Sequence, residues 1–146
     1  MRIAIASDHA GFELKKHVKA QLQSAGHDVV DVGPDSDEST DYPRYARPAA
    51  QLVAEGDAER GVLVCGSGVG VSIVANKVPG VRAVNAHDPE EAQLARNHND
   101  ANVVTLSGRR LGTEAADAIV QAFIEEEFEG GRHARRVALI EGEGTT

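Results

Sequence analysis

The sequence is poor in cysteine and in aromatic residues. Only one of its 146 residues is a cysteine, Cys65, so no intrachain disulfide can form, and a reducing compartment fits this composition. Aromatic residues make up 3% and tryptophan is absent, whereas hydrophobic residues reach 41%. The core must therefore be built from Val, Ile, Leu and Ala, as expected for an α/β domain with a buried parallel sheet.

Positive charge and long apolar runs are also scarce. The net charge is −8, which argues against nucleic acid or an anionic membrane as the main partner, although a local cluster of arginines can still bind a small anion. No apolar run approaches the length of a membrane span. The apolar stretch after Met1 is too short for a signal peptide, so we expect a cytoplasmic location.

Short β-branched runs alternate with longer amphipathic stretches along the chain. The pattern predicts strands at residues 2–6, 28–32, 61–65, 81–84 and 102–106, with a helix after each. Parallel neighbours need crossover connections, so this alternation predicts an α/β fold. We expect a three-layer, Rossmann-like doubly wound sheet of five parallel strands, in one domain spanning residues 1–146. The helix after the last strand should end at Gly130 and Gly131, and a basic helix should begin at Arg132.

The glycine-rich segment Gly66, Ser67, Gly68, Val69 and Gly70 lies between a predicted strand and a predicted helix. Three glycines in five residues allow a sharp turn that directs several N–H groups at one point, and a helix N-terminus behind them favours an anion. The spacing matches neither a dinucleotide-binding loop nor a P-loop. A tight turn without a ligand is the alternative.

Cys65 is the last residue of the strand before this loop. A free cysteine is usually a small buried hydrophobe. Here the neighbouring helix N-terminus favours a thiolate, which could abstract a proton or act as a nucleophile.

Histidines next to carboxylates occur in Asp8-His9 and in His98-Asn99-Asp100. We expect both histidines near the same edge of the sheet, where ligands of such folds bind. A structural or solvated role is the usual one for a single histidine. The sequence contains no HxH, HExxH or paired-cysteine spacing, so we expect no metal site.

Arginines gather near the C-terminal end of the sequence. On a helix, Arg132 and Arg136 lie one turn apart, which suits a phosphate because guanidinium groups match its oxygens. Arg109 and Arg110 are further phosphate candidates. A solvated helix that pairs with the acidic residues 125–127 is the alternative for the C-terminal cluster.

Taken together, these segments resemble the type B ribose-5-phosphate isomerases, within the ribose/galactose phosphate isomerase family, over nearly the whole chain. The matching segments, in order, are residues 7–11 (SDHAG), 40–43 (TDYP), 65–70 (CGSGVG), 75–77 (ANK), 98–102 (HNDAN) and 130–133 (GGRH) with Arg136 and Val137. Each segment is short, but six in the right order are highly specific. Ser67 stands where the family commonly has threonine, and the retained hydroxyl preserves its role.

The resemblance implies a metal-independent interconversion of ribose 5-phosphate and ribulose 5-phosphate, without a cofactor. Cys65 would be the base that moves a proton between C1 and C2, and the loop from Gly66 to Gly70, including Val69, would hold the enediolate oxygens with help from the Ser67 hydroxyl. His98 would open the sugar ring, assisted by Asp8. The remaining implied substrate contacts are His9, Arg132, Arg136 and Arg109 to the phosphate, and Tyr42 and Asn99 to the sugar.

Family members are dimers or pairs of dimers whose active sites share residues across the interface, so we expect the C-terminal helix to reach a partner subunit. Two alternatives stay open. One is an isomerase of another sugar phosphate, such as galactose 6-phosphate, allose 6-phosphate or a tetrulose phosphate, since the acidic segment 85–91 lies near the substrate-facing edge. The other is a phosphate- or nucleotide-binding module without catalysis, which would leave Cys65 and His98 without a role.

Overall fold

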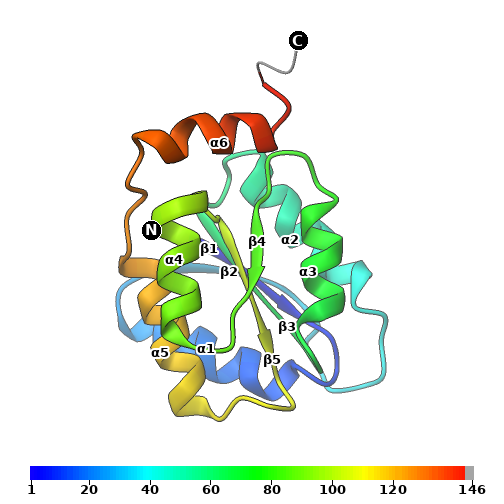
Figure 1. The fold of residues 1–146 in the computed structure, drawn as a ribbon. Coiled ribbons are helices and arrows are strands. Elements are labelled where there is room, and N and C mark those ends of the chain that lie inside the picture. Colours follow the sequence, from blue (N-terminus) through cyan, green and yellow to red (C-terminus); the bar gives the residue numbers. More distant parts are fainter. Residues whose placement is uncertain (144–146) are drawn as a thin grey trace.

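The structure, a computed structural model, describes residues 1–143, and within them five strands alternate with six helices (Figure 1). The strands are β1 (Arg2–Ser7), β2 (Asp28–Gly33), β3 (Arg60–Cys65), β4 (Ala83–Asn85) and β5 (Val103–Ser107). The helices are α1 (Phe12–Ser24), α2 (Pro43–Ala54), α3 (Val69–Asn76), α4 (Pro89–Asn99), α5 (Thr113–Glu125) and α6 (Arg132–Ile140). None of these helices is long and apolar enough to cross a lipid bilayer.

The five strands form one parallel sheet in the order β2-β1-β3-β5-β4. From β1 the chain crosses to β2 on one side, and it then returns to build β3 on the other side. The strand order therefore reverses between β1 and β3, the kind of position where open α/β sheets bind ligands outside the carboxyl ends of their strands. The predicted α/β fold with a five-stranded parallel sheet is confirmed.

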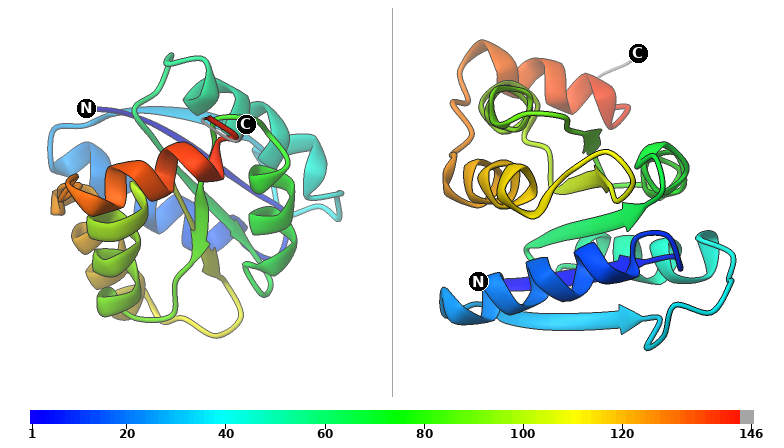
Figure 2. Two further views of the ribbon diagram at one scale, coloured as in Figure 1. Left: turned by 45° about the horizontal axis from the view of Figure 1, so that its top comes forward. Right: turned by 90° about the horizontal axis from the view of Figure 1, so that it is seen from below.

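Helices cover both faces of the sheet and enclose two apolar clusters. Alternate residues of β1 point to opposite faces, so Ile3 and Ile5 pack with α1, α4 and α5, whereas Ala4 and Ala6 pack with α2 and α3. Helix α6 belongs to neither layer. It lies across one end of the molecule, over α4 and the start of β4 (Figure 2, left).

Four strands agree with their predicted ranges to within one residue at each end, but β4 does not. Residues 81 and 82, predicted as its start, lie outside the strand. The backbone N–H of Arg82 donates to the side chain of Asn102 (2.8 Å), and its carbonyl oxygen accepts from the N–H groups of Asn102 and Val103. These bonds hold Arg82 in the connection that precedes β4.

The predicted end of α5 at Gly130 and Gly131 is also wrong. The helix ends at Glu125, and Glu126 has extended backbone angles. Helix α4 supplies the partners that favour this departure, because Arg96 donates to Glu126 O (3.1 Å) and the Asn97 amide donates to Glu127 O (2.8 Å). The basic helix α6 then begins at Arg132, as predicted.

Candidate active site

Three loops meet at the carboxyl edge of the sheet, beside the reversal between β1 and β3. They follow β1, β3 and β5, and they pack closely at two glycines. A Cβ atom on Gly11 would lie 2.5 Å from Val64 O, and one on Gly108 would lie 2.9 Å from Ala10 O. These close approaches bring the segment that contains Asp8 and His9 next to the ends of β3 and β5.

The thiol of Cys65 faces the glycine-rich loop. The side chain is only 4% exposed and packs on the α2 and α3 side of the sheet. Its Sγ accepts a hydrogen bond from the N–H of Gly68 at 3.2 Å. Gly68 caps α3 with φ +78°, a conformation that favours glycine. The sulfur therefore lies at the N-terminus of α3, where backbone N–H groups and the helix dipole stabilise negative charge.

An aromatic ring and a guanidinium group flank the loop. A Cβ atom on Gly70 would lie 2.7 Å from the Tyr42 ring, and one on Gly66 would lie 3.0 Å from the guanidinium carbon of Arg109. Tyr42 and Arg109 are both exposed. The loop thus offers backbone N–H groups and a cation to an anionic ligand, with an aromatic ring beside them.

The first loop adds a buried carboxylate and a histidine. Asp8 is 8% exposed, and its Oδ1 accepts a hydrogen bond from the N–H of Gly11 at 3.0 Å. His9 Nδ1 lies 3.2 Å from both the N–H and the carbonyl oxygen of Thr40, which joins His9 to the segment before Tyr42. When Nδ1 accepts, a neutral imidazole carries its proton on Nε2 and can donate from there.

Four other predicted site residues form a second cluster, on α4 and α6. His98 and Asn99 end α4, and Arg132 and Arg136 are exposed on α6. The ring of His98 stacks on that of His133, with centroids 4.3 Å apart and planes 11° apart.

His133 is 4% exposed, and its buried Nε2 has no hydrogen bond within residues 1–143, with the Glu129 carboxylate 3.6 Å away. Burial, followed by the charges of Arg132 and His98, lowers the pKa of His133, and Glu129 opposes this shift. A neutral imidazole is the form that these surroundings favour.

The two clusters lie at opposite ends of the sheet within one chain (Figure 1). Helix α4 starts after the carboxyl end of β4 and runs back, so its last residues reach the amino edge. There Arg82, just before β4, donates to Asn99 O (3.1 Å) and to Glu141 (2.7 Å). The expectation that His98 shares an edge with Asp8 is therefore wrong for a single chain, because a crossover helix must run antiparallel to its strands.

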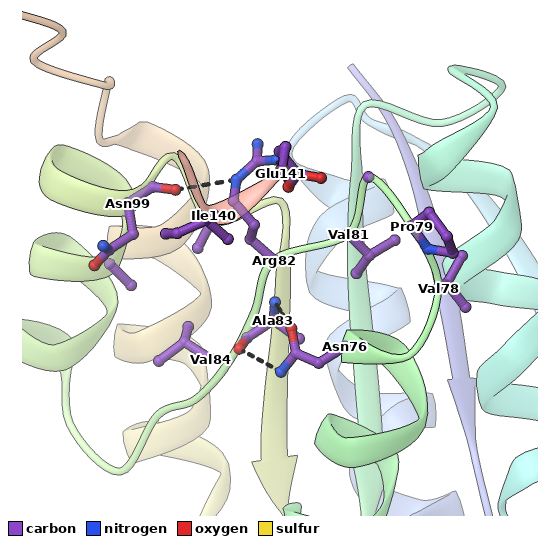
Figure 3. A pocket seen from close by; sticks show the side chains of 13 residues that line it. Asn76, Val78, Pro79, Val81, Arg82, Ala83, Val84, Asn99, Ile140 and Glu141 are labelled. Atoms are coloured by element: carbon purple, nitrogen blue, oxygen red, sulfur yellow. Dashed lines mark hydrogen bonds and ion pairs between the residues drawn. The ribbon is translucent and has the colours of Figure 1, made fainter. Parts of the chain in front are cut away.

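The amino edge is hollowed next to Asn99. A cavity of about 640 Å³ lies between β4, the end of α3 and the end of α6 (Figure 3). Its lining includes the apolar side chains of Val78, Val81 and Ile140, together with Arg82. Val78 and Val81 are buried in its wall, whereas Ile140 is 59% exposed.

Among residues 1–143, one group of side chains combines enough donors for a metal ion: His98, Glu129 and His133, whose ligand atoms lie within 4.8 Å of one another. Two features make it a poor cation site. The imidazole rings are stacked nearly parallel, so their in-plane lone pairs do not converge on one point. The positive charges of Arg132 and Arg136 also act on His133. The ring geometry and the neighbouring positive charges both disfavour a metal ion here.

Sequence reasoning missed three residues around these clusters. Thr105 lies in the middle of a buried strand, and its hydroxyl donates to Gly68 O at 2.8 Å. A hydroxyl in the middle of a buried strand was the available signal. Glu129 and His133 flank the arginine cluster in sequence, but their packing against His98 depends on the path between α5 and α6, which the sequence pattern did not predict.

Comparison with known proteins assigns the family. A family model described as Ribose/Galactose Isomerase matches residues 3–140. The chain belongs to the ribose/galactose isomerase family. It is therefore an enzyme of the isomerase class.

Individual relatives match almost end to end. The chain is 48% identical over 139 residues to ribose-5-phosphate isomerase B of Escherichia coli (strain K12), covering 95% of this chain and 93% of that protein. It is 42% identical over 141 residues to D-erythrulose-4-phosphate isomerase of Pectobacterium atrosepticum, covering 96% of this chain and 93% of that protein. The crystal structure of a ribose 5-phosphate isomerase from Thermotoga maritima superposes with a TM-score of 0.94 at 48% identity, covering 97% of each chain. This family member is thus similar to isomerases of both five-carbon and four-carbon sugar phosphates.

Proposed function

We propose that this chain interconverts ribose 5-phosphate and ribulose 5-phosphate through an enediolate, with Cys65 as the base. The observation that supports this proposal is the contact between Cys65 Sγ and the N–H of Gly68 at 3.2 Å, at the N-terminus of a helix and at the carboxyl edge of the sheet. In this arrangement the sulfur base and the loop N–H groups would face one bound sugar phosphate.

In the proposed reaction, His98 assists ring opening with the help of Asp8, and the open aldose exposes its C1 aldehyde. The Cys65 thiolate takes the proton from C2, and the electron pair forms the C1–C2 double bond while negative charge moves to O1. The thiol returns the proton to C1, and the O2 hydroxyl proton moves to O1, which leaves a ketone at C2. Loop N–H groups stabilise the enediolate oxygens, where one such donor contributes about 3–4 kcal/mol in other enzymes.

We further propose that each active site forms between two subunits. His98, Asn99, Arg132 and Arg136 of one chain would complete the carboxyl-edge cluster of a second chain, with His9 and the two arginines on the phosphate. The separation of the two clusters within one chain supports this arrangement.

Exposed apolar side chains also support this assembly. Val69 and Ile73 of α3 are 50% and 57% exposed near the carboxyl edge, and Leu139 and Ile140 of α6 are 48% and 59% exposed at the amino edge. A two-fold contact can cover both patches at once.

Mixing two inactive variants tests both parts of the proposal. Cys65→Ala should lower turnover by about 10²–10⁴-fold, the usual contribution of a general base, while binding of the substrate persists. His98→Ala should also be nearly inactive on ring-closed substrate. After joint refolding of equal amounts, about half of the dimers are mixed, and each holds one site with both native residues, so about a quarter of native activity should return.

Two results would contradict the proposal. Full activity of Cys65→Ala removes the sulfur from the mechanism. No recovery in the mixture means that Cys65 and His98 do not act in sites shared by two subunits. A parallel assay with a tetrulose 4-phosphate tests the closest rival, since a relative that is 42% identical is named for that substrate.

A further inference from the structure

Three side chains hold the carbonyl groups of the glycine-rich loop. Ser107 Oγ donates to Gly66 O at 2.7 Å, and Thr105 Oγ1 donates to Gly68 O at 2.8 Å. Between them, the amide of Asn85 lies 3.4 Å from Ser67 O. Three consecutive carbonyl oxygens are thus each in contact with a separate side chain of β4 or β5.

The register of the sheet explains why these side chains meet the loop. Thr105 pairs with Leu63 on one side and with Asn85 on the other, and Ser107 pairs with Cys65. Residues of β5 alternate between faces, and Val103 packs with α2 and α3. Thr105 and Ser107 share the face of Val103, which is also the face of Cys65, so their hydroxyls lie beneath the turn that starts α3.

Holding a carbonyl group fixes the direction of the next N–H group. In a trans peptide, the C=O of one residue and the N–H of the next point in opposite directions. The contacts to Gly66, Ser67 and Gly68 therefore orient the N–H groups of residues 67, 68 and 69 away from β4 and β5. The N–H of Gly68, which follows the Ser67 carbonyl, donates to Cys65 Sγ at 3.2 Å, and the N–H of Val69, which follows the Gly68 carbonyl, donates to Ser67 Oγ at 3.1 Å.

Thr105 is the central member of this set. It is fully buried, its hydroxyl donates to Gly68 O at 2.8 Å, and the same Oγ1 contacts Asn85 Oδ1 at 3.2 Å. Asn85 in turn leaves no room beside Gly68, where a Cβ atom would lie 2.3 Å from Oδ1. A change at Thr105 therefore reaches both the carbonyl and the side chain that confine the loop.

We propose that Thr105 is a positioning residue for the isomerase reaction: its hydroxyl fixes the peptide between Gly68 and Val69, whose N–H donates to Ser67 Oγ, and so holds the loop in place beside the Cys65 sulfur. The assignment rests on the proposed function. Thr105 itself does not touch the substrate and acts through Gly68. Its loss should therefore lower the rate of the chemical step more than it lowers substrate affinity.

Thr105→Val tests this role, because valine keeps the branched shape and removes only the hydroxyl. We expect kcat to fall by about tenfold or more and KM to change by less than about threefold, since small misplacements of catalytic groups are costly. Thr105→Ser restores the hydroxyl and should recover most of the rate. Thr113→Val, the same change at an exposed residue that begins α5, should keep the native kcat and KM.

A second measurement separates this proposal from the proposed function. Amide ¹H–¹⁵N resonances of Ser67, Gly68 and Val69 should shift in Thr105→Val and stay in place in Thr113→Val. Native kcat in Thr105→Val, or unmoved loop resonances, overturns the role of Thr105. If the native chain does not isomerise the sugar phosphate, the proposed function fails, and the resonances still decide whether Thr105 orients the loop.

Discussion

Replacing Gly68 by alanine adds one methyl group at a position where two separate penalties apply. At φ +78° a Cβ atom costs about 1–2 kcal/mol for the left-handed backbone. The same atom would lie 2.3 Å from Asn85 Oδ1 and 3.0 Å from the carbonyl carbon of Leu106, and overpacking of this kind costs about 1–3 kcal/mol. We therefore expect Gly68→Ala to lower the free energy of unfolding by about 2–5 kcal/mol.

Gly26 provides a matched control. Its φ is +90°, and a Cβ atom there would meet nothing within 4 Å, so Gly26→Ala carries only the backbone penalty. Alanine restricts the unfolded chain equally in both variants, and this contribution cancels in the comparison. The difference between the two variants should be about 1–3 kcal/mol, measured by urea denaturation at one protein concentration.

The same two variants can also be compared by their turnover number, kcat. The clash in Gly68→Ala displaces the N–H that faces Cys65 Sγ, so kcat should fall by about tenfold or more, whereas Gly26→Ala should keep the native kcat. Equal free energies of unfolding and equal turnover in the two variants would refute the idea that Asn85 confines the loop.

Two further predictions concern stability. Lys15 is fully buried and donates to Asp31 at 3.0 Å and to Pro34 O, whereas Lys19 also donates to Asp31, so Lys15→Met leaves Pro34 O without this donor but Asp31 still paired. It should lower the free energy of unfolding by about 1–3 kcal/mol in urea denaturation. Lys16→Met, which removes an exposed pair with Glu13 and a contact with the Phe12 ring, should change it by less than about 1 kcal/mol, and a similar effect of both substitutions would contradict this. Because the pKa of His133 is lowered from its ordinary 6.5, the unfolded chain takes up the proton first, so this residue contributes stability that is complete above about pH 6.5 and is lost as the pH falls. His133→Gln should therefore show a shallower loss of stability than the native chain when the pH is lowered from about 7 to 5, and equal slopes would disprove the assignment.

The sequence predicted most of the fold because each strand and helix has a local signal. β1, β2, β3 and β5 are β-branched runs, and α4 starts at Asp88, whose side chain accepts from the N–H of Glu91. β4 and the end of α5 were predicted poorly because their boundaries depend on distant partners. Asn102 holds the chain before β4, and Arg96 and Asn97 hold the chain after α5.

The candidate site was predictable residue by residue but not in space. The segments with Asp8, Cys65 and Arg109 meet because the carboxyl ends of parallel strands share one edge, a rule that needs no coordinates. Predicting the position of His98 requires knowing the direction of α4. Predicting the position of His133 requires knowing the path of the chain after α5. Thr105 was missed because a buried threonine in a strand gives no hint of its partner until the register of β4, β5 and the loop is known.

The two borders of the sheet limit how copies of this protein can associate. One border is β4, which has only three residues, and the other is β2, which carries the carboxylates of Asp28 and Asp31. A short or charged outer strand is a poor template for adding a strand from another molecule, which is how fibrils and disordered aggregates grow. Contacts between copies are thereby directed to the helices, so crowding at high concentration should favour discrete oligomers over open-ended stacking of sheets.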